Sequence, residues 1–252
     1  MNKFKIVVPM YNVEKWVKNT INTIKKQSYR NFECVIIDDI STDSSYSVVK
    51  ELIKDDDRFE LIKNTEKKFA LRNIYEGIEH LKPNANDIIV TVDGDDWLYN
   101  YNVLEKVNQV YMQSNCFITY GISVYLDDLK KGLVTPNGSE PFPPQVVANS
   151  LFRDYRWVSS HLRTFKYGLW NKIKREDLLD EDGQFFRMAW DLAFMFPMLE
   201  MAQERHRFIS DILYVYNNDN PINDHKVDTP LQLRTDRYIR RKERYSRIGG
   251  IE

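Results

Sequence analysis

The sequence predicts an α/β fold with a Rossmann-like, mostly parallel sheet that is flanked by helices. Residues 1–98 alternate between short apolar runs and segments with helical apolar spacing, which is typical of parallel strands joined by right-handed helical crossovers. The β-branched run at residues 88–92 passes directly into three carboxylates, and the run at residues 32–37 also ends in aspartates. Ligands of open α/β sheets bind at the carboxyl ends of strands, so these acids mark a shared functional edge.

The first half of the chain supplies the regular part of this pattern. Strands are expected where β-branched and aromatic residues concentrate, at residues 4–9, 32–37, 59–62 and 88–92. Pro9 is expected to end the first strand, because proline has no N–H to donate to a ladder. Amphipathic spacing predicts helices at residues 14–27, 46–53 and 70–81, the second of them after the N-cap cluster Ser41-Thr42-Asp43.

The second half is less regular. We expect a helix at residues 103–112, a strand at 116–125, a Gly- and Pro-rich loop at 127–144, a long helix at 184–205 and a strand at 208–216. A polar loop, residues 217–228, follows that last strand.

Composition narrows the class of protein. At 252 residues, with 42% hydrophobic and 29% charged residues, the chain fits one large soluble α/β domain. A net charge of −1 argues against nucleic acid as the main partner. Cys34 and Cys116 lie in apolar runs without metal-ligand spacing, so we expect reduced core thiols. With no signal-peptide pattern and no apolar run near the ~18–20 residues of a membrane span, we expect a cytoplasmic protein, with peripheral membrane association as an option.

The sequence Asp93-Gly94-Asp95-Asp96 predicts a metal site. Neighbouring carboxylates repel one another, and an isolated buried charge is strongly unfavourable. Mg²⁺ or Mn²⁺ takes oxygen ligands of this kind and shares them with substrate phosphates. The alternative is an exposed acidic turn, since Asp-Gly is a common turn pair. The matching acids at Asp38-Asp39 favour the metal site, and the lack of a G-x-G-x-x-G or P-loop pattern disfavours a dinucleotide or Walker-type site.

Three successive motifs resemble those of the inverting family 2 glycosyltransferases: residues 7–12, residues 37–43 and residues 92–96. One departure is Ile40, which stands where the family usually has glycine. The resemblance implies a GT-A fold that binds a nucleoside-diphosphate sugar together with Mn²⁺ or Mg²⁺. It also implies a division into a nucleotide-sugar-binding half (1–110), an acceptor-binding and catalytic half (111–228) and a basic C-terminal helix and tail (229–252).

The resemblance assigns donor-site residues as well. It places the first turn beside the nucleoside, Asp39 on the base, a basic residue of the third strand–helix loop near the nucleotide, and the Asp-x-Asp motif on ribose and metal. The donor residues that it implies are Pro9, Tyr11, Asp38, Asp39, Lys67, Lys68, Arg72, Asp93 and Gly94. The implied metal ligands are Asp93, Asp95 and Asp96. His225 is a candidate third ligand or diphosphate contact in a loop that closes over the donor, or else a surface histidine.

Inversion requires one general base that takes the proton from the acceptor hydroxyl. Family members carry it at the start of a helix in the second half, and Trp190-Asp191 resembles that motif, so Asp191 is the expected base. The alternative is a first-turn carboxylate that interacts only with the helix dipole. Rival carboxylates are Asp180, Glu181 and Asp182.

Candidate acceptor residues come from the same half. Trp170 and Trp190 are aromatic platforms for the acceptor or core residues. His161 and Arg163 contact phosphate or the acceptor, or belong to a solvated face.

Residues 234–247 are strongly basic, and four arginines recur at helical steps: Arg234, Arg237, Arg241 and Arg244. Such a face suits DNA or anionic lipid headgroups, or is simply solvated. The expected function is metal-dependent inverting transfer of a sugar to an acceptor hydroxyl of a saccharide or glycoconjugate. Two alternatives remain: a glycosyltransferase of viral type that acts on hydroxylated bases in DNA, and a catalytically inactive sugar-nucleotide-binding module.

Overall fold

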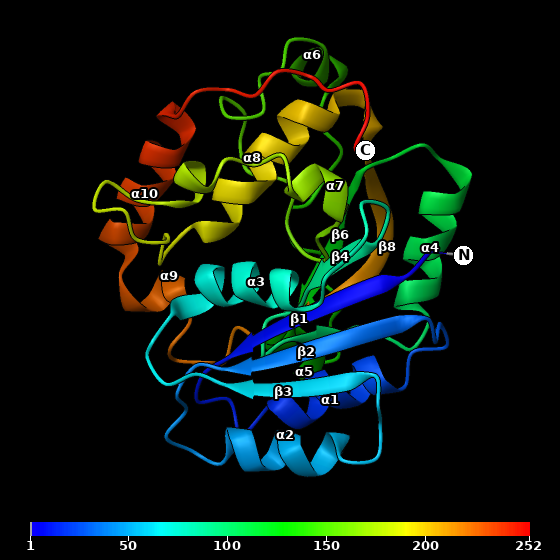
Figure 1. Cartoon of the computed structure of the whole chain (residues 1–252), viewed down its shortest axis with the longest axis vertical. Coiled ribbons are helices and arrows are strands. Elements are labelled where there is room, and N and C mark those ends of the chain that lie inside the picture. The colour runs from blue at the N-terminus through cyan, green and yellow to red at the C-terminus, as the bar shows by residue number, and fades with distance from the viewer. Residues whose placement is uncertain (1) are drawn as a thin grey trace.

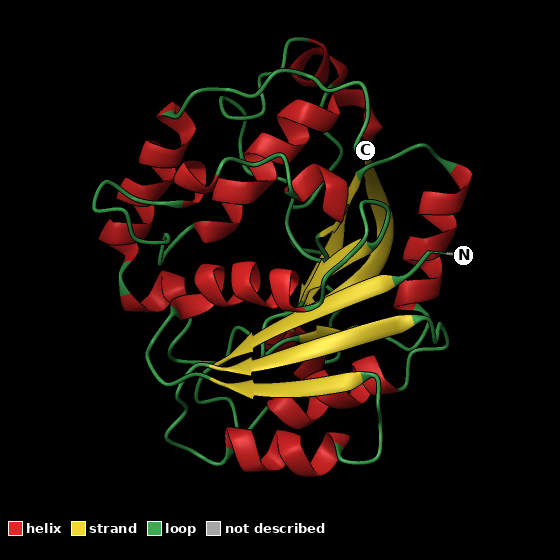
Figure 2. Cartoon of the chain, viewed as in Figure 1, coloured by secondary structure: helices red, strands yellow, loops and turns green. Residues whose placement is uncertain are grey.

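The computed structural model describes residues 2–252, except for the side chains of Asp224 and His225. An eight-stranded sheet with the order β3-β2-β1-β4-β7-β6-β8-β5 runs through the centre of the described chain (Figures 1 and 2). Helices α1 (Val17–Lys25) and α2 (Ser45–Ile53) cover one face of its first half, and α3 (Phe69–His80) covers the other. The predicted α/β class, with a mostly parallel sheet flanked by helices, is confirmed.

The first half of the sheet is parallel throughout. Its strands are β1 (Phe4–Met10), β2 (Phe32–Asp38), β3 (Phe59–Lys63) and β4 (Ile88–Thr91). β1 pairs with β2 and with β4, and β2 pairs with β3. Successive residues of β1 are buried on both faces, because α1 packs on one side and α3 on the other.

One boundary differs from the prediction, because β1 continues through Pro9 to Met10. The β4 ladder ends at the Val7–Thr91 pair, so no partner strand needs an N–H from Pro9 on that side. There the Pro9 carbonyl instead accepts from the backbone N–H of Gly94 (3.1 Å).

The second half adds two antiparallel steps. β7 (Thr164–Lys166) runs antiparallel to both β4 and β6 (Ile118–Tyr125), and β6 is parallel to β8 (His206–Tyr216). Two reversals restore the direction, so β6 and β8 end at the same edge as β1 and β4. β5 (Trp97–Leu98) closes the sheet against β8. The remaining helices are α4 (Val103–Gln113), α5 (Leu126–Lys130), α6 (Pro144–Ala148), α7 (Tyr167–Trp170), α8 (Trp190–Ala202), α9 (Asp224–Val227) and α10 (Thr229–Arg241), with 3₁₀ turns at Arg175–Leu178 and Gln203–Arg205.

The predicted helix at 184–205 is wrong at both ends. Helix α8 begins only at Trp190, because Ala189 has a left-handed backbone (φ 49°) that a helix cannot include. At the other end the chain leaves the helix at Gln203, which also has a positive φ of 44°. Almost every residue of α8 is buried, so its apolar pattern is continuous and does not mark where the helix starts.

The predicted basic helix of the tail is also shorter than expected. Helix α10 ends at Arg241, so Arg244 is not part of its face and instead pairs with Asp154 (2.6 Å). Beyond α10 the tail runs back over the molecule, where Arg247 pairs with Glu204 and Ile251 is buried.

Two further expectations concern composition. Cys34 and Cys116 are buried and form no disulfide, as predicted for core thiols. Among the described residues no helix combines the length and apolar character needed to cross a membrane.

We predict that Gly168→Ala destabilises the protein by about 1–3 kcal/mol, the usual cost of overpacking. A Cβ on Gly168 would stand 2.1 Å from the carbonyl oxygen of Ile251, so the docked tail would have to move. Gly249→Ala is the matched control, since its Cβ would meet nothing within 4 Å. Urea denaturation measures both variants, and equal free energies of unfolding would contradict the prediction.

Candidate active site

A cavity of about 620 Å³ opens at the edge where the parallel strands end. Segments far apart in the sequence form its walls: the turn after β1, the loop before α3, the acidic loop after β4, the segment before β7, the start of α8, and the loop that leads to α10. The predicted site residues that line it are Pro9, Tyr11, Asp39, Lys67, Asp93, Gly94, Asp95, Asp96, His161, Arg163, Trp190 and Asp191.

Gly94 fixes the acidic loop against the end of β1. A Cβ at this position would stand 2.6 Å from the Cβ of Met10 and 2.9 Å from the carbonyl oxygen of Pro9. Only glycine allows this close approach of two backbones. The loop therefore turns tightly and presents its three carboxylates at the cavity.

The pKa values of the three carboxylates are shifted in different directions. Asp96 is 1% exposed, and burial together with the charges of Asp95 and Asp93 raises its pKa well above the usual range. Burial, reinforced by Asp93, also raises the pKa of Asp95 to about 6, although the amide of Asn220 donates to it (2.6 Å). Burial would raise the pKa of Asp93 too, but the neighbouring His161 and Arg163 outweigh this effect and lower it.

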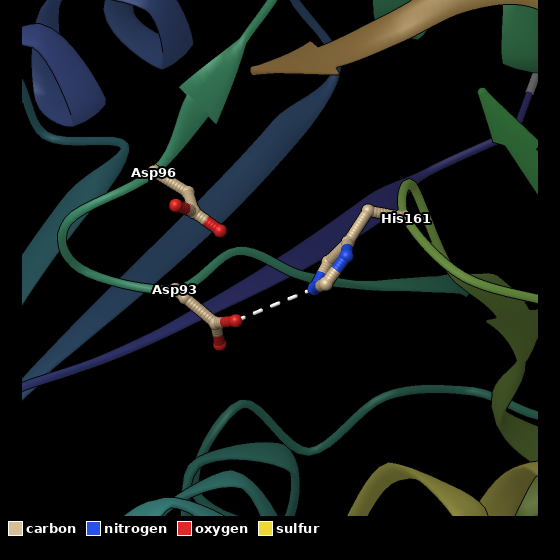
Figure 3. Close-up of side chains that lie close together, drawn as sticks. All are labelled: Asp93, Asp96 and His161. Atoms are coloured by element: carbon tan, nitrogen blue, oxygen red, sulfur yellow. Dashed lines mark ion pairs between the residues drawn. The ribbon is translucent and has the colours of Figure 1, made fainter. Parts of the chain in front are cut away.

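Asp93, Asp96 and His161 form a candidate metal site. One ligand atom of each lies within 4.8 Å of the others, and Figure 3 shows the His161 ring directed at Asp93. The Oδ1 atom of Asp96 accepts from the backbone N–H of Asn217 (2.7 Å), whereas Oδ2 is buried without a hydrogen-bond partner among the described groups. An orphaned carboxylate oxygen beside two further acids is the environment that a divalent cation stabilises.

The protonation of His161 is consistent with such a site. Burial, and then the charge of Arg163, lowers its pKa, so the ring is neutral. Arg163 Nη2 lies 2.7 Å from His161 Nε2, and a guanidinium can only donate. Nε2 therefore accepts from Arg163, and a metal bound through this nitrogen would replace that hydrogen bond.

This set differs from the one expected. His161 was assigned to the acceptor, yet it completes the cluster with Asp93 and Asp96. Asp95 is not part of that cluster and bonds to Asn220 instead. The side chain of His225 lies outside the described residues, so its predicted role stays a prediction.

Arg163 connects this cluster to Asp191. Its guanidinium is 2% exposed, donates to Asp191 Oδ2 (3.0 Å) through Nη1, and contacts His161 through Nη2. Asp191 is the second residue of α8, so the left-handed turn at Ala189 sets its position. Its carboxylate thus faces the same cavity as the acidic loop, besides lying in the first turn of a helix.

Asp39 organises the side of the cavity at the end of β2. Its carboxylate accepts from Asn64 Nδ2 (2.8 Å) and from the backbone N–H groups of Lys68 (2.8 Å) and Phe69 (2.9 Å). Burial would raise its pKa, but these hydrogen bonds and the charge of Lys67, 3.3 Å away, outweigh it and lower the pKa. Asp39 thereby ties the loop before α3 to the end of β2. At the next position Ile40, in place of the family's usual glycine, has a left-handed backbone with φ 60°.

Of the three basic candidates only Lys67 lines the cavity, where its ammonium stands over the ring of Tyr11. Lys68 and Arg72 both turn to Glu76, at 2.7 Å and 2.8 Å, and are not among the lining residues. Asp38 is also not among them: it is fully buried, and its carboxylate accepts weakly from the backbone of Ser41 (3.4 Å).

The assignment of Trp170 to the acceptor is corrected. Its ring is 3% exposed, stacks on Phe165 (5.5 Å between centroids) and packs against Phe194, so it is a core residue. Trp190 lines the cavity, with the guanidinium of Arg163 5.4 Å from its ring centroid.

Sequence reasoning missed other lining residues. Asn73 on α3 is one of them, and its buried Nδ2 has no partner among the described groups. Many of the others come from the segment before α8, which was predicted to be helical, and from the polar loop after β8: Arg187, Met188, Ala189, Asn220, Ile222, Asn223, Val227 and Asp228. The polarity of that loop indicated a possible binding role. The sequence did not show that the loop folds back to the cavity.

The mostly parallel sheet, with an acidic loop where a strand ends and a carboxylate opposite, is the architecture of GT-A fold glycosyltransferases. Residues 5–141, more than half of the chain, match the family described as "Glycosyl transferase family 2". The chain belongs to glycosyltransferase family 2.

Relatives and solved structures agree with this membership. Glycosyltransferase GlyG of Streptococcus pneumoniae is 29% identical over 219 residues, which cover 84% of this chain and 69% of GlyG. The structure of Staphylococcus aureus TarS 1-349 in complex with UDP-GlcNAc superposes with a TM-score of 0.64 at 17% identity, over 90% of this chain and 61% of that one. A mannosyltransferase from Pyrobaculum calidifontis, solved with GDP-Man and Mn²⁺, gives a TM-score of 0.57 at 17% identity, over 88% and 59% of the two chains. At such identities the structures show a shared fold, and this chain spans 49% and 39% of two other relatives that it matches.

We predict that Asp96→Asn removes one destabilising effect of rising pH on the metal-free protein. The pKa of Asp96 is raised in the folded state, so its stabilising contribution is full below the ordinary carboxyl pKa and is lost as pH rises toward the folded pKa. Relative to the variant, the wild type should therefore lose free energy of unfolding as pH rises above the ordinary carboxyl pKa, by up to ~1.4 kcal/mol per unit for this one group.

The exposed Asp182→Asn is the matched control and should follow the wild type. Chemical denaturation across the acidic to neutral range measures the slopes. Identical slopes for Asp96→Asn and the wild type would contradict a raised pKa of Asp96 in the folded protein.

Proposed function

We propose that this protein transfers a sugar from a nucleoside-diphosphate sugar to an acceptor hydroxyl, with a divalent metal and with inversion at the anomeric carbon. One observation carries the proposal: the cluster of Asp93, Asp96 and His161 faces the same cavity as Asp191, and Arg163 bonds to both. A metal-binding cluster and a separate carboxylate across one cavity are what a single displacement requires.

The donor would lie along the ends of β1, β2 and β4. Tyr11 offers an aromatic face at the nucleoside end, and Lys67 brings positive charge beside it. The Nδ2 group of Asn73, which has no partner among the described groups, adds a hydrogen-bond donor for the nucleotide. When bound at Asp93, Asp96 and His161, Mn²⁺ or Mg²⁺ would neutralise charge on the departing diphosphate as a Lewis acid.

Asp191 would act as the general base. Arg163 holds its Oδ2 atom, which leaves Oδ1 to accept the proton of the acceptor hydroxyl. The Asp191 side chain is 20% exposed, so an acceptor can reach it. The rival carboxylates Asp180, Glu181 and Asp182 are not among the cavity residues.

A saccharide is the acceptor that the surroundings favour. A second cavity of about 490 Å³ adjoins the first through His161 and Tyr216. Its other lining residues offer hydroxyl, amide, amine and aromatic groups, which suit a sugar: Ser123, Tyr125, Asn137, Ser160, Asn218 and Lys226.

The direct test is a panel of UDP-, GDP- and dTDP-sugars, screened for thermal stabilisation with and without Mn²⁺. One nucleotide sugar should raise the melting temperature more with Mn²⁺ than with EDTA, because its diphosphate and the acidic cluster would share the ion. Proton NMR of the product then reports whether the anomeric configuration inverts. Equal stabilisation with EDTA would contradict metal dependence, and binding of a donor without any turnover would favour the inactive binding module.

We predict that Asp191→Asn keeps donor affinity within a few-fold and lowers turnover by roughly 10²–10⁴, the usual contribution of general-base catalysis. The amide retains an oxygen that accepts from Arg163 but cannot take a proton. Asp180→Asn removes a rival carboxylate and should leave turnover unchanged. Initial rates and donor titrations separate the two effects, and joint loss of donor binding and turnover would show that Asp191 belongs to the donor site.

A further inference from the structure

The outer face of α10 forms a surface that the proposed reaction does not use. Successive helical residues are about 100° apart, so Leu233, Arg234, Arg237 and Arg241 occupy one side of α10. Thr235 and Ile239 lie on the opposite side and are buried against the molecule. We call Val227, Leu233, Arg234, Arg237 and Arg241 the basic–apolar rim. Figure 1 shows α9 and α10 at the periphery, beside the edge toward which β1, β2 and β3 point.

The three arginines of the rim differ from their basic neighbours. Arg240 bonds to Asp236 and to the backbone of Arg153, and Arg244 pairs with Asp154. Arg234, Arg237 and Arg241 are exposed and form no ion pair with any described side chain. Their charge is therefore directed at solvent, on a chain whose net charge is only −1.

The rim is apolar as well as basic. Val227 is 61% exposed, Leu233 is 53% exposed, and Ile222 nearby in the chain is 43% exposed. A single exposed apolar residue needs no explanation, but here several lie within twelve positions of one another, among arginines. Ile222 and Val227 also line the main cavity, so the rim continues to its mouth.

We propose that the basic–apolar rim docks the protein on an anionic lipid bilayer, with the mouth of the active-site cavity toward the membrane surface. Arginines bind lipid headgroups, while Val227 and Leu233 enter the boundary between headgroups and acyl chains, as in interfacial amphipathic helices. The acceptor then belongs to the class of saccharides that are presented on a membrane lipid. This second statement rests on the proposed function, whereas the docking itself does not.

DNA is the weaker fit for the same surface. Only three arginines face outward, and binding to a phosphate backbone gains nothing from exposed aliphatic side chains at the same place. A bilayer can bind both the arginines and the aliphatic side chains, because its anionic headgroups lie directly beside its apolar interior.

Vesicle flotation tests the docking without any need for turnover. The full chain should bind phosphatidylcholine–phosphatidylglycerol vesicles and leave pure phosphatidylcholine vesicles largely unbound. The triple variant Arg234→Gln, Arg237→Gln, Arg241→Gln should lose on the order of 100-fold in partition, at about fivefold for each arginine near an anionic surface. Leu233→Ser should weaken binding by about tenfold, because it removes an inserted aliphatic side chain.

The matched control is Lys15→Gln, Lys18→Gln, Lys50→Gln, which removes the same charge from exposed positions on or beside α1 and α2. It should bind as the wild type does. Equal loss in this control would show a nonspecific charge effect and overturn the proposal, as would absence of wild-type binding to the anionic vesicles.

A duplex DNA titration completes the design. If DNA binds more tightly than vesicles, and the triple variant lowers the slope of log K against log salt by about 2–3 units, the surface is a DNA site and the proposal is wrong. Donor stabilisation by the nucleotide-sugar panel is measured on the same samples. Vesicle binding without any donor binding would leave the docking intact and contradict the proposed function alone.

Discussion

The structure depends on one electrostatic constraint, the crowding of three aspartates, one buried and two half-buried, within four positions at the end of β4. Burial, and then the charges of the neighbouring aspartates, raises the pKa of Asp96 and of Asp95. One buried oxygen of Asp96 has no hydrogen-bond partner among the described groups. A fold selected only for stability would not retain such a cluster, because apolar residues of similar size would be cheaper to bury. The divalent cation that we propose for this cluster would offset the repulsion, so the aspartates would cost stability in the free protein and gain it back on binding.

The second half of the chain is assembled around these aspartates. Tyr214 Oη accepts the backbone N–H of Asp93 (3.0 Å), the backbone N–H of Asn217 donates to Asp96, and the amide of Asn220 donates to Asp95. These partners lie 121 to 125 residues further along the chain, at the end of β8 and in the loop after it. The strand order explains the contact, because two antiparallel steps return β6 and β8 to the edge where β4 ends.

How far the sequence predicts this architecture differs between the two halves. The parallel first half follows from local patterns, since each strand and helix has its own periodicity and the acids mark the strand ends. The metal cluster does not follow from local patterns, because His161 joins Asp93 and Asp96 only through the order of β4, β7 and β8. Likewise Trp170 and Trp190 look alike in sequence, and only the tertiary packing places Trp170 against Phe165 and Trp190 at the cavity. The family resemblance predicts a role for Asp191, and only the three-dimensional structure shows that Arg163 is its hydrogen-bond partner.

A buried ion pair links the two surfaces that the proposals assign. Arg153 donates twice to Glu200 on α8 (2.6 and 2.9 Å) and once to the carbonyl of Ile239 on α10 (2.7 Å). The same carboxylate accepts from the backbone of Tyr245 (3.0 Å), so the pair is well satisfied, as a buried ion pair must be. Helix α8 carries Asp191 at its start, and α10 carries the basic–apolar rim. One hydrogen-bonded network therefore holds both helices, so the basic–apolar rim and Asp191 keep a fixed relative orientation. A membrane that binds the rim of α10 would then set the direction from which an acceptor approaches Asp191.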